Sequence, residues 1–321
     1  MSNEATLKIS LIINPASGTS EQGALLLETL APMSGVTILT TDAAGEGERL
    51  ARQAVAEGAE LVVAAGGDGT INEVVKGLLE AERRVPLGII PLGTGNDLAR
   101  TLALPTDPLE AWKLILVGER RKLDVIEIRT PRELHYALNV SAGGFSGQLN
   151  EAMSSEVKSA WGPLAYLRGA LGVLPDLTSY RTTIQYDDQA PEQVDALNII
   201  IANGRTAAAG VQVAPFANPE DGLLDVVIVH YGSIMQLAGA AARLLVNGNY
   251  LNSELVELRR AKKVQVISDP EIWFNADGEL ITNEPIVFEA LPQALEVVVG
   301  AEYQAVIEDS GARSQGSGIS D

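Results

Sequence analysis

Two loops of the sequence combine glycines with an acidic residue. The segment GGDGT at 66–70 follows an apolar run at 61–65 and precedes apolar residues with helical spacing. This order favours phosphate binding, because glycines let the backbone approach a polyphosphate and the helix amino terminus faces the anion. Asp68 would repel phosphate unless a divalent cation lay between them, so it indicates Mg²⁺. For this motif alone, a structural turn between strand and helix remains the alternative.

The second loop strengthens the ligand-binding interpretation. The segment PLGTGND at 91–97 also follows an apolar run and opens a short helix, with Thr94 as a candidate cap and Asp97 in the first turn. Thr70 and Glu73 have the spacing of a capping box, which would fix the start of the helix that follows the first loop. Two such loops at the carboxyl ends of parallel strands would line one crevice. Neither loop contains a P-loop or a G-x-G-x-x-G pattern, so positive charge must come mainly from a metal and backbone amides.

Further polar segments have two possible interpretations. The loop NPASG at 14–18 and the residue Thr41 follow predicted strands and are either turns or ligand contacts. Polar segments at 218–225 and 275–280 each contain Asp-Gly, which is also the commonest hairpin signal. Asp277 and Glu279 nevertheless stand two residues apart, close to one face if the strand continues, as general-base chemistry would require. His135 and His230 lie in or at the end of strand-like runs and receive no catalytic role.

The elements that must position these residues fall into two halves. Up to residue 125, apolar runs at 8–14, 35–40, 61–65 and 87–91 alternate with helical patterns such as 45–57 and 71–79, which predicts a doubly wound parallel sheet. After residue 124 the pattern changes to short β-prone runs, which predict a second, mostly β domain. These runs are 124–129, 134–141, 181–186, 197–203, 223–230, 263–268, 272–275 and 295–299, with helical insertions near 162–173 and 233–246.

Composition limits the function. A chain of 321 residues with 46% hydrophobic and 20% charged residues predicts a folded protein of about two domains. A formal charge of −19 disfavours nucleic acid as a partner, and the absence of cysteine excludes disulfides and thiolate metal sites. The start of the chain lacks the pattern of a signal peptide, so a cytoplasmic location is expected. The most apolar helical stretch is too short and too polar to span a bilayer, so any membrane contact should be peripheral, at the inner surface.

Taken together, the motifs resemble a known family. The segments 14–18, 66–70, 91–97, 139–145, 221–225 and 277–279 are similar, in order, to those of bacterial lipid kinases related to the diacylglycerol kinase and sphingosine kinase catalytic domains. The resemblance covers the chain to about Val306. It implies an α/β fold of the NAD kinase and diacylglycerol kinase type. The implied parts are a doubly wound nucleotide-binding domain at 1–125, a β-sandwich-like lipid-substrate domain at 126–300, and a return segment with a disordered tail at 301–321.

The resemblance also implies roles for individual residues. Glu279 would accept the proton of a lipid hydroxyl, with Asp277 beside it and Asp68 as the rival base. Asp68 and Asp97 would belong to a network of Mg²⁺ and water. A structural Mg²⁺ would be held by Asp221 with the backbone carbonyls of Asn218 and Leu223. ATP would bind between the domains and contact Asn14, Thr41, Gly66, Gly67, Asp68, Gly69, Thr70, Ile71, Asn72 and Thr94.

The predicted function is therefore ATP-dependent phosphorylation of a membrane-lipid hydroxyl, within lipid metabolism and phospholipid biosynthesis. A soluble nucleotide kinase of the NAD kinase type is the first rival, because it shares the glycine-aspartate loop. A nucleotide-binding regulator without turnover is the second, and the intact acidic positions disfavour it. The identity of the lipid depends on the wall of the cleft, and the candidates are diacylglycerol, phosphatidylglycerol and sphingoid or ceramide-like lipids. The sequence leaves the oligomeric state open.

Membrane docking requires a local surface, because the net charge of −19 opposes attraction to anionic lipids. The expected patch spans 160–174 and includes Trp161, Leu164 and Leu167, with Lys158 and Arg168 as its basic residues.

Overall fold

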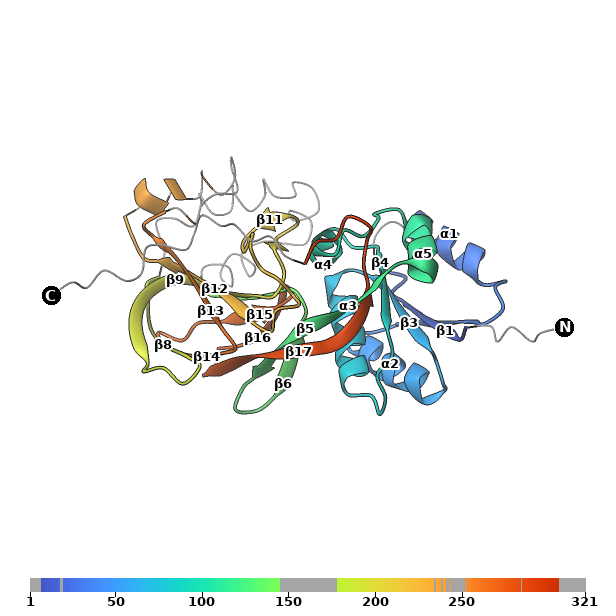
Figure 1. The fold of residues 1–321 in the computed structure, drawn as a ribbon, viewed down its shortest axis with the longest axis horizontal. Helices are drawn as coiled ribbons and strands as arrows, with labels where there is room; N and C mark the ends of the chain where they lie inside the picture. The colour runs from blue at the N-terminus through green and yellow to red at the C-terminus, as the bar shows by residue number, and fades with distance from the viewer. Residues whose placement is uncertain are drawn as a thin grey trace.

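The chain forms two lobes that are joined side by side (Figure 1). The computed structural model describes residues 7–17, 20–144, 178–233, 235–237, 239–240, 243, 251, 253–283 and 285–305. The first lobe contains the helices α1–α5 and the strands β1–β4, and the second lobe is built mainly of strands (Figure 1). The expected docking patch at 160–174, the helical insertion at 162–173 and most of the insertion at 233–246 lie outside the described residues.

The first lobe is a parallel sheet in the order β4-β3-β1-β2. Three of its four strands are buried along their whole length, as expected for strands covered on both faces. All four apolar runs that predicted strands are confirmed. The strands are β1 (Ile9–Ile13), β2 (Val36–Thr40), β3 (Leu61–Gly66) and β4 (Leu87–Pro91).

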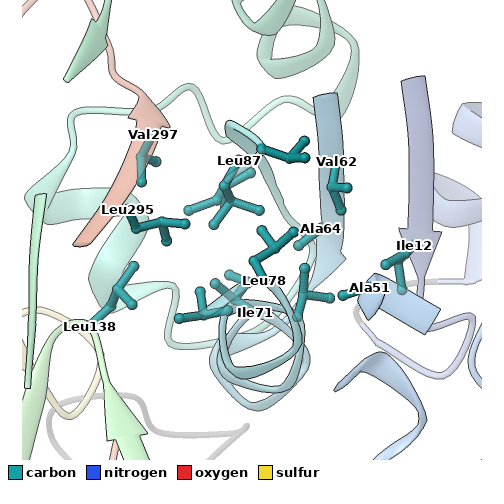
Figure 2. Packing of buried hydrophobic residues seen from close by; sticks show 14 of the residues in the cluster. Ile12, Ala51, Val62, Ala64, Ile71, Leu78, Leu87, Leu138, Leu295 and Val297 are labelled. Carbon is teal, nitrogen blue, oxygen red and sulfur yellow. The ribbon is translucent and has the colours of Figure 1, made fainter. Parts of the chain in front are cut away.

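Helices cover both faces of this sheet, which confirms the doubly wound fold. Alternate strand residues face opposite sides, so Val62 packs in the cluster with α2 and α3, whereas Val63 packs in the cluster with α5. Figure 2 shows the first of these clusters, in which Ile71 and Leu78 of α3 lie close to Leu87. The helices are α1 (Ser20–Leu30), α2 (Glu46–Ala56), α3 (Asp68–Leu79), α4 (Asp97–Thr101) and α5 (Pro108–Val117).

The predicted capping box is wrong. Helix α3 begins at Asp68 with Gly67 as its N-cap and without a side-chain cap, so Thr70 and Glu73 already lie inside the helix. The Glu73 carboxylate instead accepts hydrogen bonds from the backbone of a different segment, at 45–47. The reason is tertiary, because α2 packs against α3 and places the N–H groups at its amino terminus within hydrogen-bond distance of Glu73.

Thr94 does not cap α4 either. The N-cap is Asn96, in the left-handed conformation at φ 51°, and it forms no side-chain cap. Its side-chain amide donates instead to the carbonyl of Gly93, which closes the loop on itself at 2.6 Å. Asp97 is the first residue of α4, so the prediction that it lies in the first turn is confirmed.

The second lobe confirms the mostly β prediction. Its described strands follow the order β16-β15-β7-β9-β8-β14-β17, and β12 and β13 extend from β9. The core includes Phe274 and Phe288, whose ring centroids lie 5.2 Å apart. The strand β13 did not stand out in the sequence, because three of its residues are exposed and two of these are arginines. The strands are β6 (Leu134–Ala137), β7 (Val140–Gly144), β8 (Tyr180–Tyr186), β9 (Glu192–Ala202), β10 (Thr206–Ala207), β11 (Val211–Gln212), β12 (Leu224–His230), β13 (Val256–Ala261), β14 (Lys263–Asp269), β15 (Phe274–Ala276) and β16 (Glu279–Thr282).

Two long strands, β5 (Arg120–Arg129) and β17 (Ile286–Val298), connect the lobes (Figure 1). They pair antiparallel on both sides of an irregularity between Leu291 and Leu295. Beyond it, Val297 pairs in parallel with Leu87 of β4, and the end of β17 enters the first-lobe core (Figure 2). The expected boundary between 125 and 126 therefore falls inside a strand, and the chain returns to the first lobe before residue 301. Among the described residues, no helix is both long and apolar enough to cross a bilayer.

Candidate active site

A cavity of about 590 Å³ lies at the carboxyl ends of the first-lobe strands. Its walls come from the loops after β1, β2 and β3 and from one residue of the second lobe, Glu279. Six residues predicted for the site meet here, although the sequence separates them by up to 265 positions. The described lining residues are Asn14, Pro15, Ala16, Ser17, Thr41, Asp42, Ala43, Ala44, Gly67, Gly69, Thr70, Glu73 and Glu279.

Glycine is required where the loops and the second lobe meet. A Cβ atom on Gly69 would lie 2.7 Å from Oε1 of Glu279, so a side chain at this position would displace the carboxylate. A Cβ atom on Gly93 would lie 2.6 Å from Cα of Gly67, so the two glycine loops lie against each other. The second loop therefore lies against the first, but none of the described lining residues comes from 91–97, so the expectation that both loops line one crevice is met only by the first loop.

Asn14 links the loop after β1 to α3. Its amide donates to Thr70 Oγ1 at 3.3 Å, and its side-chain oxygen accepts from the backbone of Ala16 at 2.9 Å. The second bond is a local turn, so Asn14 serves as a turn residue and as part of the cavity wall at once. Thr41 is buried, and its backbone N–H donates to the carbonyl of Ile13 at 3.0 Å.

Asp68 lies at the start of α3, within the first glycine loop. Its Oδ1 is buried and has no hydrogen-bond partner among the described residues. The pKa of Asp68 is raised to about 6, mainly by removal from water and also by the charge of Asp97, although backbone N–H groups at 96–98 act in the opposite direction. A carboxylate oxygen in this position has the chemistry of a ligand for a hard divalent cation.

Asp97 ties the second glycine loop to the second lobe. Its Oδ1 accepts from the backbone of Gly210 at 2.7 Å and its Oδ2 from Ala209 at 2.9 Å. Ala208, Ala209 and Gly210 all have positive φ, at 53°, 64° and 102°. Non-glycine residues rarely adopt this conformation, so the turn holds its amides toward Asp97 at a cost in backbone energy.

The remaining predicted contacts lie outside the cavity lining. The Ile71 side chain is buried in the first-lobe core, and its backbone N–H donates to Gly67 (Figure 2). Asn72 points to the second lobe and donates to Asp277 Oδ2 at 3.4 Å. Gly66 packs against the side chain of Thr70, because a Cβ atom on Gly66 would lie 2.6 Å from Cβ of Thr70. Thr94 is exposed.

Asp277 and Glu279 do not share a strand face, which corrects the expectation. Asp277 and Gly278 have φ of 46° and 95° and form the two-residue turn between β15 and β16, so the chain reverses between the two acids. The Asp277 carboxylate accepts three backbone amides at the start of β7, from residues 138, 139 and 140, at 2.8–3.1 Å. The pKa of Asp277 is raised to about 7, mainly by burial and also by the charge of Asp68, although these amides act in the opposite direction.

Glu279 faces the glycine loop from the second lobe. The residue is exposed overall, yet its carboxylate lies against Gly69, and partial removal from water raises the pKa of Glu279 above its ordinary value. The charge of Glu73 adds to this rise. A carboxylate with a raised pKa beside the glycine loop at 66–70 is suited to accept a proton.

The loop expected to hold a structural Mg²⁺ lies away from the cavity. Asp221 Oδ1 accepts from the backbone of Leu223 at 3.0 Å, and Asn218 Oδ1 accepts from Glu220 at 3.1 Å. Burial raises the pKa of Asp221, and Arg260 lies 3.8 Å from its Oδ2. The described residues contain no cluster of three or more acidic, histidine or cysteine side chains with metal-binding geometry.

The sequence did not reveal two acidic residues that position the loops of this region, Glu73 and Asp124. Glu73 was interpreted as a cap of its own helix, and only the packing of α2 reveals its other partners. Asp124 is fully buried and accepts from the backbone of Gly222 and Gln293, which connects the 218–223 loop to β5 and β17. A single acid within an apolar run was the available signal for Asp124.

His135 and His230 each pair with a glutamate, at 3.3 and 3.2 Å, in keeping with structural roles.

Comparison with known proteins identifies the family. Residues 8–128 match the diacylglycerol kinase catalytic domain, and residues 139–299 match the YegS C-terminal NAD kinase beta sandwich-like domain. A diacylglycerol kinase of Staphylococcus carnosus (strain TM300) is 33% identical over 291 residues, which cover 89% of this chain and 93% of that protein. A diacylglycerol kinase of Bacillus subtilis (strain 168) is 29% identical over 304 residues, covering 93% and 98%.

Solved structures share the fold. A Bacillus anthracis str. Sterne structure described as a candidate diacylglycerol kinase has a TM-score of 0.79 and 24% identity, and covers 95% of this chain and 100% of that one. The chain therefore belongs to the diacylglycerol kinase family of ATP-dependent lipid kinases.

Proposed function

We propose that this chain transfers the γ-phosphoryl group of ATP to the free hydroxyl of a membrane lipid, with Glu279 as the proton acceptor. The observation that carries the proposal is the position of Glu279, whose carboxylate lies against Gly69 of the glycine loop at the edge of the cavity. An acid from the second lobe thus meets the loop that is suited to hold phosphates. The comparisons favour neither the NAD kinase type nor a regulator without turnover.

The cavity suits a nucleotide polyphosphate. Gly67, Gly69 and Thr70 stand at the amino terminus of α3, where unpaired N–H groups and the helix dipole attract anions. Asn14 and Thr41 line the neighbouring wall. None of the described lining residues is basic, so neutralisation of the phosphates must come from amides and a cation. Gly66, Ile71, Asn72 and Thr94 would act as supports of these loops.

The residues present fit a Mg²⁺ ion, because the buried Oδ1 of Asp68 has no partner among the described residues. When bound, Mg²⁺ would neutralise the charge of the transferred phosphoryl group. Both carboxylate oxygens of Asp97 already accept hydrogen bonds from the backbone amides of Ala209 and Gly210. Asp97 would therefore contact the ion through a water molecule and not directly. The oxygen donors of Asp221, Asn218 and Leu223 also suit Mg²⁺, as a structural site that steadies the second lobe.

The reaction needs alignment and one proton acceptor. The lipid hydroxyl oxygen forms a bond to the γ-phosphorus, the bond from that phosphorus to the bridging oxygen breaks, and ADP leaves with the electron pair. Glu279 takes the hydroxyl proton as the bond forms, and its raised pKa favours this transfer. Asp277 holds the turn that carries Glu279, because it anchors the hairpin to the start of β7. Asp68 remains the rival base.

The lipid substrate implies peripheral contact with a membrane surface. The expected docking patch with Trp161, Leu164 and Leu167 lies outside the described residues, so it stays a prediction. Binding to neutral liposomes that survives substitution of all three residues would contradict that patch.

The decisive experiment is phosphoryl transfer from labelled ATP with Mg²⁺ to a panel of hydroxyl-bearing lipids in mixed micelles. We expect labelled phospholipid from the parent chain. Glu279→Ala should form it at a rate at least about a hundredfold lower, which is the typical contribution of one general base. Asp68→Ala should also abolish product. Glu110→Gln is the matched control, because this carboxylate is exposed on α5 and does not line the cavity.

The rival functions give different results. Labelled NAD in place of labelled lipid would move the chain to the nucleotide-kinase type and contradict the role of Glu279. ATP binding without ADP production on any acceptor would support a regulator. Full activity of Glu279→Ala with no activity of Asp68→Ala would transfer the role of the base to Asp68.

A further inference from the structure

We propose that Glu73 is a positioning residue. It holds the segment 42–47, which forms one wall of the nucleotide cavity, against helix α3. The inference rests on the proposed function, since it assigns this cavity to ATP. It concerns how the cavity keeps its shape, and it gives Glu73 a role that differs from the capping of its own helix.

The carboxylate of Glu73 makes two charge-assisted hydrogen bonds to another helix. Oε1 accepts from the backbone of Gly45 at 2.7 Å, and Oε2 accepts from Gly47 at 2.8 Å. Gly45 is the N-cap of α2, at φ 82°, and no side chain of α2 caps it. The first N–H groups of a helix have no partner inside the helix, so Glu73 supplies from α3 the cap that α2 lacks.

Sterics make this contact specific. A Cβ atom on Gly47 would lie 2.8 Å from Oε2 of Glu73 and 2.9 Å from its Cβ. About one turn further along α3, a Cβ atom on Gly77 would lie 2.3 Å from the carbonyl oxygen of Glu48. Glycines on both helices thus permit the close approach that places the carboxylate between them.

The contact reaches the cavity through the segment before α2. Glu46 accepts from the backbone of Asp42 at 2.6 Å, and Asp42, Ala43 and Ala44 line the cavity. Glu73 also lines it, together with Gly69 and Thr70 of the same helix. The carboxylate of Glu73 therefore sets the separation between the wall at 42–44 and the phosphate-binding loop. Its loss should weaken ATP binding and leave the phosphoryl-transfer step largely intact.

The primary test is Glu73→Gln, measured by calorimetric binding of Mg·ATP and by steady-state kinetics. A glutamine keeps the size of the side chain, but its NH₂ group faces a backbone N–H. We expect Kd and KM for ATP to rise about tenfold, the effect of losing one charge-assisted hydrogen bond, with kcat changed less than about threefold. Amide hydrogen exchange at residues 45–47 should become faster.

Two further variants separate positioning from general stability. Gly47→Ala leaves Glu73 intact but pushes its carboxylate away, so it should reproduce the rise in KM. Asp107→Ala removes the side-chain oxygen that caps α5 by accepting two backbone hydrogen bonds, at 3.0 and 2.9 Å, and this residue does not line the cavity. It should lower Tm and leave KM unchanged.

The outcomes distinguish this inference from the proposed function. Folded Glu73→Gln and Gly47→Ala proteins that bind Mg·ATP as tightly as the parent chain would overturn the role of Glu73. An equal rise in KM for Asp107→Ala would also overturn it, because the effect would then follow from stability alone. Tight ATP binding by the parent chain without lipid phosphorylation would contradict only the proposed function.

Discussion

At the residue scale, the environment separates three carboxylates that the sequence presents as equals. Asp68 is half-buried and has one oxygen without a partner in the described part of the chain, Asp277 is anchored by three backbone amides, and Glu279 faces the cavity. Only Glu279 combines a raised pKa with access to the cavity and freedom from backbone donors among the described residues. These differences support a cation ligand, a structural anchor and a proton acceptor, respectively.

The raised pKa of Glu279 gives a pH dependence with a definite sign. A base must be deprotonated, so kcat/KM should fall as the pH drops through the raised pKa, above the ordinary value of 4.5. Glu73→Gln removes a neighbouring negative charge that favours the protonated form, so it should move this acidic limb to lower pH. A pH profile of kcat/KM between about pH 4 and pH 8 measures both effects. An acidic limb at the same pH in the two proteins would contradict the electrostatic influence of Glu73.

At the scale of elements, short turns from the second lobe set the position of first-lobe loops. The turn at 208–210 directs two amides to Asp97, and the turn at 277–278 anchors Glu279 opposite Gly69. Both turns place non-glycine residues at positive φ. Such strain persists only where the surrounding contacts compensate it, which here are hydrogen bonds to buried carboxylates.

Relief of this strain should be measurable in the 208–210 turn. Ala209→Gly keeps the backbone amide that binds Asp97 and removes the Cβ penalty at φ 64°, so the free energy of unfolding should rise by up to about 1 kcal/mol. Ala207→Gly is the matched control: Ala207 lies in β10 outside the positive-φ residues, and glycine there should destabilise the protein. Urea unfolding of both variants tests this, and destabilisation by Ala209→Gly would show that the turn is unstrained.

At the scale of the whole molecule, β5 and β17 make the two lobes interdependent. The end of β17 joins the parallel sheet beside β4, and Leu295 and Val297 complete the cluster around α2 and α3 (Figure 2). The first lobe therefore needs residues from near the end of the chain for its core. The cavity depends on the same connection, because Glu279 reaches Gly69 only when the lobes are joined.

Truncation of Leu295 should test this dependence. Leu295 is 3% exposed, so Leu295→Ala should lower the free energy of unfolding by roughly 2–5 kcal/mol through lost burial and a residual cavity. Leu258→Ala on β13, where the side chain is 38% exposed, should cost less than about 1 kcal/mol. Denaturant unfolding followed separately in each lobe would show whether the first lobe unfolds early. Equal effects of the two substitutions would mean that the returning strand contributes little to the first-lobe core.

Local patterns predicted much of this fold and part of the candidate site. Parallel strands buried on both faces are continuous apolar runs, so 61–65 and 87–91 were recognisable without any tertiary information. The glycine-aspartate loops were recognisable because glycine permits close approach within a few residues. Asp277 and Glu73 were misread, since a two-residue turn reverses the chain after one and a neighbouring helix supplies the partners of the other.

The sequence by itself determined the doubly wound first half, the β-rich second half and the residue types available for phosphate and cation binding, because these follow from periodicity and local chemistry. The tertiary structure alone decided which carboxylate faces the cavity, which one serves as an anchor and where the chain returns to the first lobe. Contacts such as Glu279 with Gly69, or Asp97 with Gly210, join residues more than 100 positions apart. Their formation depends on the packing of whole elements, which no local pattern encodes.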